Sequence, residues 1–523
     1  MSLTPDWPDA PGPRVLMLVA NDITIDTRVR KTASSVARAG YSVIALGIDT
    51  RGISPSKEVL DGALLVRVVP ESDPRISPNR IRMSRPELTE ALRYRAETRK
   101  QRLQVARRTL SADIAHATDD SPSWLESWGR STASVARRLG VYEETSRRIG
   151  RRTTRELRRA RRWFRFGPRK TTTILSQFVH QGLVFGSRFL ARPSRPFLRK
   201  ATWRRDIPDL HHYEVAVGPL IDSLEPDLIH AHDIFLLGIA ARAKARAVRA
   251  GREVRLIYDA HEYVPGLPID QRRRDAYENL ENEYFDRADS VITVSPGLAE
   301  LLKRRFGGPS AVVLNAPDTR HRIQTRNLRD VLDIPAEAPL VVYVGGVAPH
   351  RGAEVLVEAV ARLAGSVHLA FVSNSTTGYV RDLLELGRSE GLNGRIHIAP
   401  YVAPEAVVSY ISTATVSAIP LSRQYVNYEI ALPNKLFQSI HAGVPVAVSD
   451  NPEMARFVRE HGVGEVFAGG NPNSLRTVLE KMIEAPERYT AALSRSELLE
   501  TISWAHQEET LLTTYRKVRV GGP

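Results

Sequence analysis

Two series of short β-rich runs, each run followed by a helical segment, constrain the fold of this 523-residue chain most strongly. The first series opens with RVLMLVA at 14–20, a helix that ends near Ala39 and a second strand, YSVIALG. The second series opens with LVVYVGG at 340–346. Strand–helix–strand units of this kind predict parallel sheets with helices on both faces. Because the chain is too long for one core, we predict two α/β halves with a ligand between them, near the carboxyl ends of the strands.

The remaining elements follow the same alternation. In the first series, strands are expected at 63–69, 226–233, 254–263, 290–295 and 311–317, with helices at 213–224, 234–250, 271–288 and 296–307. In the second, strands at 367–375, 395–400, 416–421 and 444–450 accompany helices at 353–363, 378–390, 404–412, 434–442 and 472–485, before a last helix at 503–516. We therefore expect a disordered tail at 1–12, a first domain at 13–317, a polar linker at 318–327, a second domain at 328–500, and a C-terminal helix within 501–523 that packs back on the first domain.

The composition excludes several classes of protein. The chain has no cysteine, which excludes disulfides, thiolate metal sites and a cysteine nucleophile. No run reaches the roughly 20 apolar residues that span a bilayer. The N-terminal MSLTPDWPDAPGPR lacks the apolar core of a signal peptide. We expect a cytoplasmic protein.

The positive charge is concentrated in one segment. Residues 85–205 hold 30 Lys and Arg against 10 Asp and Glu, a net charge of +20, so the rest of the chain carries 15 − 20 = −5. Arginine-dense helices with aromatic residues such as Trp163 and Phe164 are typical of segments that lie on an anionic membrane. Nucleic-acid binding and a solvated insertion without a ligand are the alternatives, and nucleic acid is the less favoured partner.

A candidate anion site lies in LPNKLFQSIHAGVPV. Pro433 and Asn434 are expected to begin a short helix, with Asn434 as its cap, and Gly443 to end it. Lys435 then stands in the first turn, where free backbone N–H groups already favour an anion. A lysine there opposes the helix dipole, so a bound phosphate explains it better than folding does. A solvated surface lysine is the alternative.

A second candidate follows the strand that opens the second half. In YVGGVAPHRG, Gly345 and Gly346 let backbone amides approach a phosphate, and Arg351 supplies positive charge. The pattern matches neither GxGxxG nor a P-loop, and a plain strand-to-helix turn is the alternative. Together with Lys435 it makes a two-cation site suited to a diphosphate.

Two polar clusters close strands of the first half. They are HAHD, with His230, His232 and Asp233, and DAHE, with Asp259, His261 and Glu262. Both should project into one crevice. A metal centre of a hydrolase is one interpretation, and structural histidines at strand ends are another. In the first loop, Asp26 and Arg28 read more readily as a local ion pair than as catalytic groups.

In combination, these motifs resemble the retaining glycosyltransferases of family 4, which have the GT-B fold. The likeness covers roughly 13–70 and 207–515 and leaves the basic segment outside. It rests on DTRVRKTASSVARAGYSV, LIHAHD, LIYDAHEY, SVITVS, YVGG…RGAEVLVEA and LPNKLFQSIHAGVPVAVSDNPE in that order. The resemblance implies two Rossmann-like, doubly wound domains facing a cleft, with the basic segment as a helical insertion in the first. It implies hexosyl transfer from a nucleotide-sugar with retention of configuration and without a metal or other cofactor.

The resemblance also assigns residues. Arg351 and Lys435 would bind and neutralise the leaving diphosphate, and His261 would contact the donor sugar, so these three are the expected catalytic residues. The nucleotide-sugar would be held by Gly345, Gly346, Arg351, Val402, Asn434, Lys435 and Gln438. The acceptor side would be lined by Asp26, Arg28, His232 and Asp233.

Several departures from the family pattern stand out. Family members usually carry Glu where Gln438 stands and often Arg where Gly346 stands, and Glu429 is one residue out of register with the first glutamate of the family's pair. The first loop, NDITIDTR, also lacks the glycines that many members have.

We therefore expect transfer of a sugar to a lipid-linked, polysaccharide or other glycan acceptor in cell-envelope polysaccharide biosynthesis, by a protein peripheral on the inner face of the membrane. An epimerase-like GT-B enzyme, a non-catalytic scaffold that binds membrane or nucleic acid through its basic segment, and a metal-dependent hydrolase are the alternatives.

Overall fold

A computed structural model of the chain describes residues 5–24, 26–48, 56–68, 201–321, 323–363, 365–373 and 378–518. The predicted basic helical insertion lies outside these ranges apart from its last residues, 201–205, which include the start of helix α7 (Trp203–Asp206). In the part of the chain described, no helix combines the length and apolarity needed to cross a membrane.

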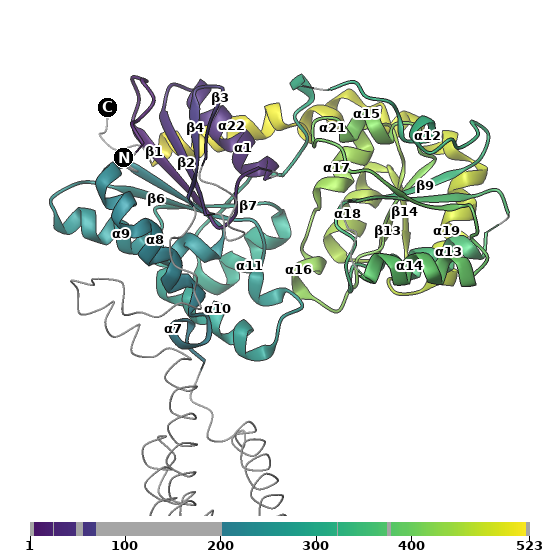
Figure 1. Cartoon of the computed structure of the whole chain (residues 1–523), viewed down its shortest axis with the longest axis horizontal. Coiled ribbons are helices and arrows are strands. Elements are labelled where there is room, and N and C mark those ends of the chain that lie inside the picture. The colour runs from purple at the N-terminus through teal and green to yellow at the C-terminus, as the bar shows by residue number, and fades with distance from the viewer. Residues whose placement is uncertain are drawn as a thin grey trace, which may run out of the picture. The chain divides into compact units, whose positions relative to one another are not determined.

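The first half is built on an eight-stranded sheet with the order β3-β4-β2-β1-β5-β6-β7-β8 (Figure 1). Every neighbouring pair is parallel except β3 and β4, which form a hairpin. The strands are β1 (Arg14–Val19), β2 (Ser42–Ile48), β3 (Ser56–Leu60), β4 (Ala63–Val68), β5 (Leu228–His232), β6 (Arg255–Ala260), β7 (Ser290–Thr293) and β8 (Ala311–Val312). Besides α7, the helices of this half are α1 (Thr27–Arg38), α8 (Asp209–Leu224), α9 (Ile234–Arg249), α10 (Gln271–Tyr284) and α11 (Pro296–Phe306).

The second half is built on a wholly parallel six-stranded sheet with the order β11-β10-β9-β12-β13-β14. Its strands are β9 (Leu340–Val344), β10 (His368–Val372), β11 (Ile396–Ala399), β12 (Val416–Ile419), β13 (Val446–Ser449) and β14 (Gly464–Phe467). Its helices are α12 (Leu328–Val331), α13 (Ala353–Ala361), α14 (Gly378–Ser389), α15 (Val407–Ile411), α16 (Val426–Glu429), α17 (Asn434–His441), α18 (Pro452–His461), α19 (Pro472–Glu484), α20 (Thr490–Leu493) and α21 (Ser496–Thr501).

The last helix, α22 (Trp504–Lys517), packs on the first half, where it lies beside α1 (Figure 1). Trp504, Leu511 and Tyr515 are buried in the same apolar core as Val15 and Met17 of β1. The Trp504 indole N–H donates to Ser35 Oγ at 3.0 Å, so the polar atom of this buried ring is satisfied. The C-terminal segment is therefore part of the core of the first half.

Strand order fixes where ligands can reach each sheet. β1 pairs with β2 on one side and with β5 on the other, and β9 lies in the same way between β10 and β12. In open parallel sheets, ligands bind beyond the carboxyl ends of the strands at such a reversal of order. The loops after β1, β5, β9 and β12 are thus the places where the fold positions a site.

Several elements were not predicted. They are the hairpin strand β3, the strand β14 and helices α16, α18, α20 and α21. Helices α16 and α20 are only one turn long, whereas the ten-residue α18 was missed although it buries Met454, Ala455 and Val458 at a helical spacing. The expected disordered tail at 1–12 is wrong for its described part, because Trp7 Nε1 donates to Leu224 O at 2.8 Å and Ser42 Oγ donates to Pro8 O at 2.6 Å. A buried indole N–H usually has a hydrogen-bond acceptor, and the carbonyl of Leu224 at the end of α8 is the acceptor for Trp7.

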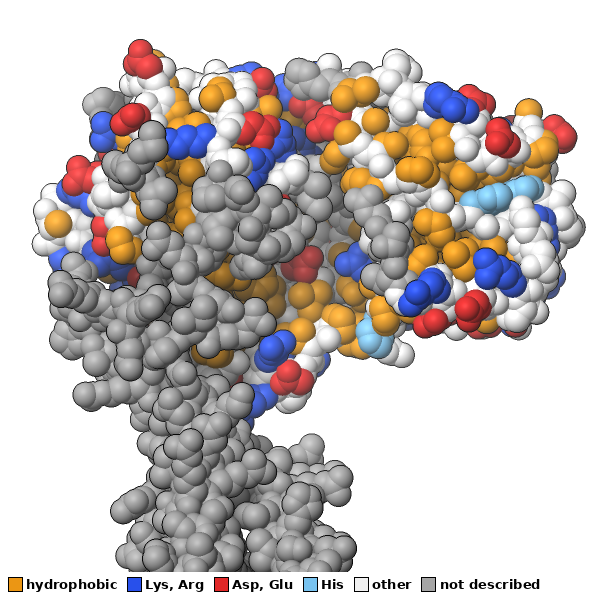
Figure 2. All heavy atoms as spheres, in the orientation of Figure 1, with side chains coloured by type: hydrophobic (Ala, Val, Ile, Leu, Met, Phe, Trp, Pro, Cys, Tyr) orange, Lys and Arg blue, Asp and Glu red, His pale blue; other side chains and the backbone are white. Residues whose placement is uncertain are grey.

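The described surface has mixed charge. On the visible face of the second half, Lys and Arg side chains alternate with Asp and Glu (Figure 2). This agrees with the mildly acidic balance of the chain outside residues 85–205.

Candidate functional site

Helix α17 presents Lys435 to the end of β9. Pro433, in an extended conformation, precedes the helix, and Asn434 is the first helical residue, so the predicted side-chain cap by Asn434 is wrong. The Lys435 side chain is 91% buried, given a relative exposure of 9%, and its Nζ lies 3.8 Å from the centre of the Tyr343 ring. Among the described residues, Nζ has no hydrogen-bond partner. A buried ammonium in contact with only an aromatic face is poorly compensated, and an anionic ligand would supply what is missing.

The pKa of Lys435 reflects this environment. Burial and, to a smaller extent, the positive charge of Arg351 together lower the pKa of Lys435 from 10.5 to about 7. The two cations therefore face a common space, and no described carboxylate neutralises Lys435 by an ion pair. A diphosphate in that space would restore the full charge of the lysine.

The loop from β9 to α13 has a backbone that depends on glycine. Gly345 adopts φ +101°, and a Cβ atom on it would lie 3.8 Å from Lys435 Nζ. Gly352 adopts φ +76°, and a Cβ atom there would lie only 1.9 Å from Pro420 O. Arg351 stands between them and interacts with the hydroxyl groups of Tyr343 and Tyr428. We call Tyr343, Gly345, Arg351 and Lys435 the lysine corner.

The other residues predicted for the nucleotide are less constrained. Gly346 O accepts a hydrogen bond from Tyr343 Oη at 3.0 Å, so this glycine supports the lysine corner through its backbone. Gln438 is half-buried one turn after Lys435, and Val402 is a half-buried residue packed on the core beside β11. The structure brings Gly345, Arg351 and Lys435 together, and it shows no contact that joins Val402 to them.

At the carboxyl ends of β5 and β6, six residues form a buried polar network, which we call the histidine cluster: Arg28, His230, His232, Asp259, His261 and Tyr515. Its centre is Asp259, which is fully buried and accepts hydrogen bonds from Arg28 Nε and Nη2, both at 2.8 Å. Arg28 Nη1 also donates to Val313 O at 2.8 Å. Arg28 is therefore not a local partner of Asp26, because it bonds to Asp259 and Val313 inside the core. Its place on the acceptor side stays a prediction.

Three imidazoles surround the same carboxylate. The nearest nitrogens of His230, His232 and His261 lie 3.6, 3.6 and 3.5 Å from Asp259 Oδ2. His232 Nδ1 lies 3.1 Å from His261 Nε2, and the rings of His230 and His232 are stacked with centres 4.1 Å apart. His230 Nδ1 is 2.5 Å from Tyr515 Oη of α22. His230 and His232 are fully buried, whereas the His261 side chain is 16% exposed.

These contacts separate the protonation states of the histidines. Burial lowers the pKa of His232 to about 3 and also lowers that of His230, so both are neutral at pH 7. Burial acts on His261 as well, but the negative charge of Asp259 and the hydrogen bond to it more than compensate, and the pKa of His261 is raised. Arg28 is the main cause that holds the pKa of Asp259 well below its usual range despite burial.

His230, His232 and Asp259 are close enough to consider a metal site, since ligand atoms from the three lie within 4.8 Å of one another. Asp233, which the sequence grouped with these histidines, is not a member of that set. Both oxygens of Asp259 accept from Arg28, and His230 Nδ1 is taken by Tyr515. A divalent ion there would sit against a guanidinium, so the arrangement fits an ion-pair network rather than a hydrolase metal centre.

Three carboxylates interact electrostatically with His261. Asp26 caps α1 by accepting from Val29 N at 3.1 Å, and its pKa is lowered because His261 and other partners outweigh its burial. Asp233 caps α9, and burial raises its pKa to about 7. Its backbone is strained, with φ 66° and ψ 165°, a region that non-glycine residues rarely occupy. Glu262, which the sequence placed next to His261, interacts electrostatically with both His261 and Arg351.

Hydrogen bonds also join the first half to the second beside this site. Tyr263 N donates to Asn427 Oδ1 at 2.8 Å, and Ser295 Oγ donates to Ile430 O at 2.6 Å. Tyr263 follows His261 and Glu262 directly, and Asn427 belongs to α16, which follows β12. The histidine cluster is thereby anchored to the half that carries the lysine corner.

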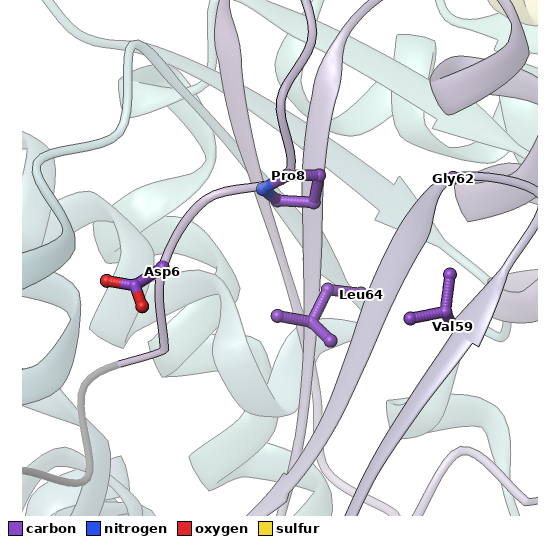
Figure 3. A pocket seen from close by; sticks show the side chains of 5 residues that line it. All are labelled: Asp6, Pro8, Val59, Gly62 and Leu64. Carbon is purple, nitrogen blue, oxygen red and sulfur yellow. The ribbon is translucent and has the colours of Figure 1, made fainter.

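One shallow hollow of about 160 Å³ lies elsewhere, lined by Asp6, Pro8, Val59, Gly62 and Leu64 (Figure 3). It is formed by the N-terminal segment and the hairpin β3–β4 at the edge of the first sheet. Apolar side chains dominate its lining, so it lacks the converging polar groups of a binding site.

Comparison with known proteins gives two family matches. Residues 338–485 match the family described as "Glycosyl transferases group 1", and residues 179–321 match "Glycosyltransferase Family 4". Curated relatives are named D-inositol 3-phosphate glycosyltransferase. The Rhodococcus opacus protein is 25% identical over 254 residues, which cover 46% of this chain and 56% of the relative. The Nocardiopsis dassonvillei protein is 25% identical over 316 residues, which cover 55% of this chain and 70% of the relative. The chain thus spans about half the length of the first of these relatives.

Solved structures share the fold. Sucrose-phosphate synthase from Thermosynechococcus elongatus is 14% identical with a TM-score of 0.59, and the match covers 97% of this chain and 98% of that one. Anabaena HepE, determined in complex with UDP and glucose, is 12% identical with a TM-score of 0.53 over 97% and 100%. At these identities the likeness shows the architecture, two α/β domains of the GT-B type.

Proposed function

The chain belongs to glycosyltransferase family 4 with the GT-B fold, and on that premise we propose that it transfers a sugar from a nucleotide-sugar to a hydroxyl-bearing acceptor. The observation that carries the proposal is the unpartnered ammonium of Lys435, buried in the first turn of α17 beside Arg351. A leaving nucleoside diphosphate develops negative charge, and cations placed at that charge stabilise the transition state. We further propose that transfer retains the anomeric configuration, as the resemblance to the retaining enzymes of family 4 implies. We also propose that it needs no metal, because two protein cations already face the diphosphate position.

The proposed roles follow the geometry. Arg351 and Lys435 neutralise the diphosphate, and the free amide groups at the start of α17 add to their field. His261 contacts the donor sugar from the first half. Gln438 and the segment near Val402 would hold the nucleoside. UDP is the first nucleotide to test, since HepE was solved with UDP and glucose.

We propose an uncharged acceptor for the first half. The relatives are named for a phosphorylated acceptor, but the described cations around the first loop already have partners. Arg28 binds Asp259, Arg30 and Arg67 bind Glu58, and Lys31 binds Asn315 Oδ1 and Ala316 O. The charged groups that remain around the first loop and the histidine cluster are the carboxylates of Asp26, Asp233 and Glu262. Carboxylates accept hydrogen bonds from the hydroxyls of a glycan and repel a phosphate. A lipid-linked or polysaccharide acceptor would meet this requirement.

From the sequence of the basic segment we also propose that the protein binds an anionic membrane surface. An arginine-rich segment that binds anionic lipid would bring a lipid-linked glycan to the enzyme. Flotation with liposomes that contain or lack anionic lipid tests this, and absence of binding to either would remove it.

A turnover assay tests the main proposal. Release of nucleoside diphosphate from UDP-, GDP- and ADP-sugars is measured with neutral glycosides and with inositol phosphate as acceptors, with and without EDTA. We expect turnover with one donor and a neutral acceptor, retained in EDTA, and a fall of about 10²- to 10³-fold in Lys435→Ala. Lys481→Ala, which removes an exposed lysine of the same half, is the control. Epimerised donor without transfer would favour the epimerase-like alternative, and no nucleotide chemistry at all would favour the scaffold.

A further inference from the structure

The histidine cluster contains more buried polar contacts than are needed for His261 to contact a donor sugar. Asp259 makes a two-point pair with Arg28 in the core and lies within 3.6 Å of a nitrogen of each of three histidines, yet the only one of these side chains that reaches the surface is His261. A buried ion pair contributes little net stability compared with apolar packing. The pair is better explained by what it does to the exposed histidine.

We propose that Asp259 is a positioning residue that keeps His261 as an imidazolium, with His232 as the acceptor of its Nε2 proton, so that Nδ1–H is presented to the substrate. The distances fit this pattern of protons. His232 Nδ1 and Asp259 Oδ2 lie 3.1 and 3.5 Å from His261 Nε2, so a proton on Nε2 has two acceptors, one of them charged. His261 Nδ1 is then the only ring nitrogen of the cluster available to a ligand.

Tyr515 supports the same arrangement from α22. Burial raises the pKa of Tyr515 well above its usual value, so the phenol stays protonated. In the proposed arrangement its hydroxyl donates to His230 Nδ1, because His230 can then direct an Nε2–H at the carboxylate of Asp259. The neutral His230 then carries its proton on Nε2, the nitrogen that faces Asp259 Oδ2 at 3.6 Å. Arg28 and His230 thus hold Asp259 in place, and Asp259 in turn accepts from His261.

Other charged and titratable groups also surround His261. They are Asp26 and Arg28 from α1, His230, His232 and Asp233 from β5 and the start of α9, and Asp259 and Glu262 from β6 and its loop. The carboxylates outnumber the one guanidinium, and that guanidinium is already paired with Asp259. A charged His261 would add a third positive group to those of Arg351 and Lys435 at the departing diphosphate.

The test reads the protonation of His261 directly and needs no substrate. Histidine ring signals of the whole protein are followed by ¹⁵N and ¹³C NMR over pH 5–9, with His261 assigned by its loss in His261→Gln. In the wild type, we expect both nitrogens of His261 to carry protons at pH 6.5, and a pKa above the usual 6.5. A wild-type His261 that is neutral at pH 6.5 would overturn the proposal, whatever the variants do.

Variants then test the cause. Asp259→Asn leaves Arg28 unpaired in the core, so the double variant Arg28→Met/Asp259→Asn, which removes both charges, is made with it. We expect the pKa of His261 to fall by about one to three units. Arg305→Met/Glu281→Gln removes another buried pair and is the control. An unchanged pKa in the folded double variant would show that Asp259 does not hold the proton.

The use of the imidazolium in catalysis rests on the proposed function. If transfer occurs, the basic limb of the profile of kcat/KM against pH should move to lower pH in the double variant, beyond any uniform loss of rate. A protein without transferase activity but with the expected His261 titration would contradict the proposed function and leave the positioning role standing.

Discussion

Tyr515 Oη and His230 Nδ1 lie 2.5 Å apart, although the two residues are 285 positions apart in the chain. Through this bond the last helix, which follows the whole second half, reaches the polar network at the centre of the first half. Both side chains are fully buried, so neither atom can exchange its partner for water. The C-terminal helix is therefore a structural part of the candidate site.

Tyr515→Phe should destabilise the protein by about 1–3 kcal/mol, because it leaves His230 Nδ1 buried without a donor. The measurement is the free energy of unfolding in urea. Tyr41→Phe is the matched control, since the Tyr41 ring packs edge-on against Tyr515 at 5.7 Å while its hydroxyl has no hydrogen bond among the described contacts. Equal stability of the two variants would show that the hydroxyl bond contributes nothing.

Lys435→Met should abolish nucleotide binding without lowering the stability of the free protein. The pKa of Lys435 is about 7 in the folded chain and 10.5 in an unfolded one. Between these values the unfolded chain binds one more proton than the folded chain. Lys435 therefore makes the free energy of unfolding rise with pH from 7 to 10, and it lowers that free energy most below pH 7. We expect an equal or higher free energy of unfolding at pH 6.5 for the variant. A clear loss would mean that the ammonium already has a stabilising partner in the free protein.

Binding of a nucleoside diphosphate should take up a proton above pH 7. An anion beside Lys435 raises its pKa, so affinity should fall by up to about tenfold per pH unit between pH 7.5 and 9. Calorimetry at pH 8 in two buffers with different ionisation enthalpies measures the uptake, which should approach one proton. Proton release, or affinity independent of pH, would place the anion elsewhere.

Gly352→Ala should be far more damaging than Gly443→Ala. Both glycines have positive φ, +76° and +72°, so each substitution costs about 1 kcal/mol from the backbone alone. A Cβ atom at Gly352 would also lie 1.9 Å from Pro420 O, whereas at Gly443 it meets nothing within 4 Å. We expect Gly352→Ala to lose nucleotide binding as well, by displacing Arg351. Similar thermal stability and binding for the two variants would contradict this account of the loop.

The sequence predicted the parts of the molecule that local pattern controls. The βα alternation, Lys435 in the first turn of a helix, and the two polar strand ends at one sheet edge all follow from short stretches of chain. The resemblance to family 4 and the GT-B fold is confirmed by the family matches and by the shared architecture.

The sequence did not predict contacts between distant residues. Arg28 was read as a partner of Asp26, two positions away, but it binds Asp259, 231 positions away. No local pattern distinguishes these choices, because Asp26 caps α1 while Asp259 lies near the end of β6, and only the strand order β1-β5-β6 brings Asp259 to Arg28. The same holds for Tyr515, whose helical period predicts burial but not the histidine it meets. Asn434 was assigned as a cap because its residue type favours that position, and the extended Pro433 took the position instead.

Calorimetric binding of UDP, GDP and ADP to the wild type, to Lys435→Ala and to Lys481→Ala tests the central claim most directly. We predict that one nucleotide binds the wild type and Lys481→Ala alike, and that Lys435→Ala loses this binding. Binding that survives in Lys435→Ala, or no binding of any of the three to the wild type, would contradict the assignment of the lysine corner as the diphosphate site.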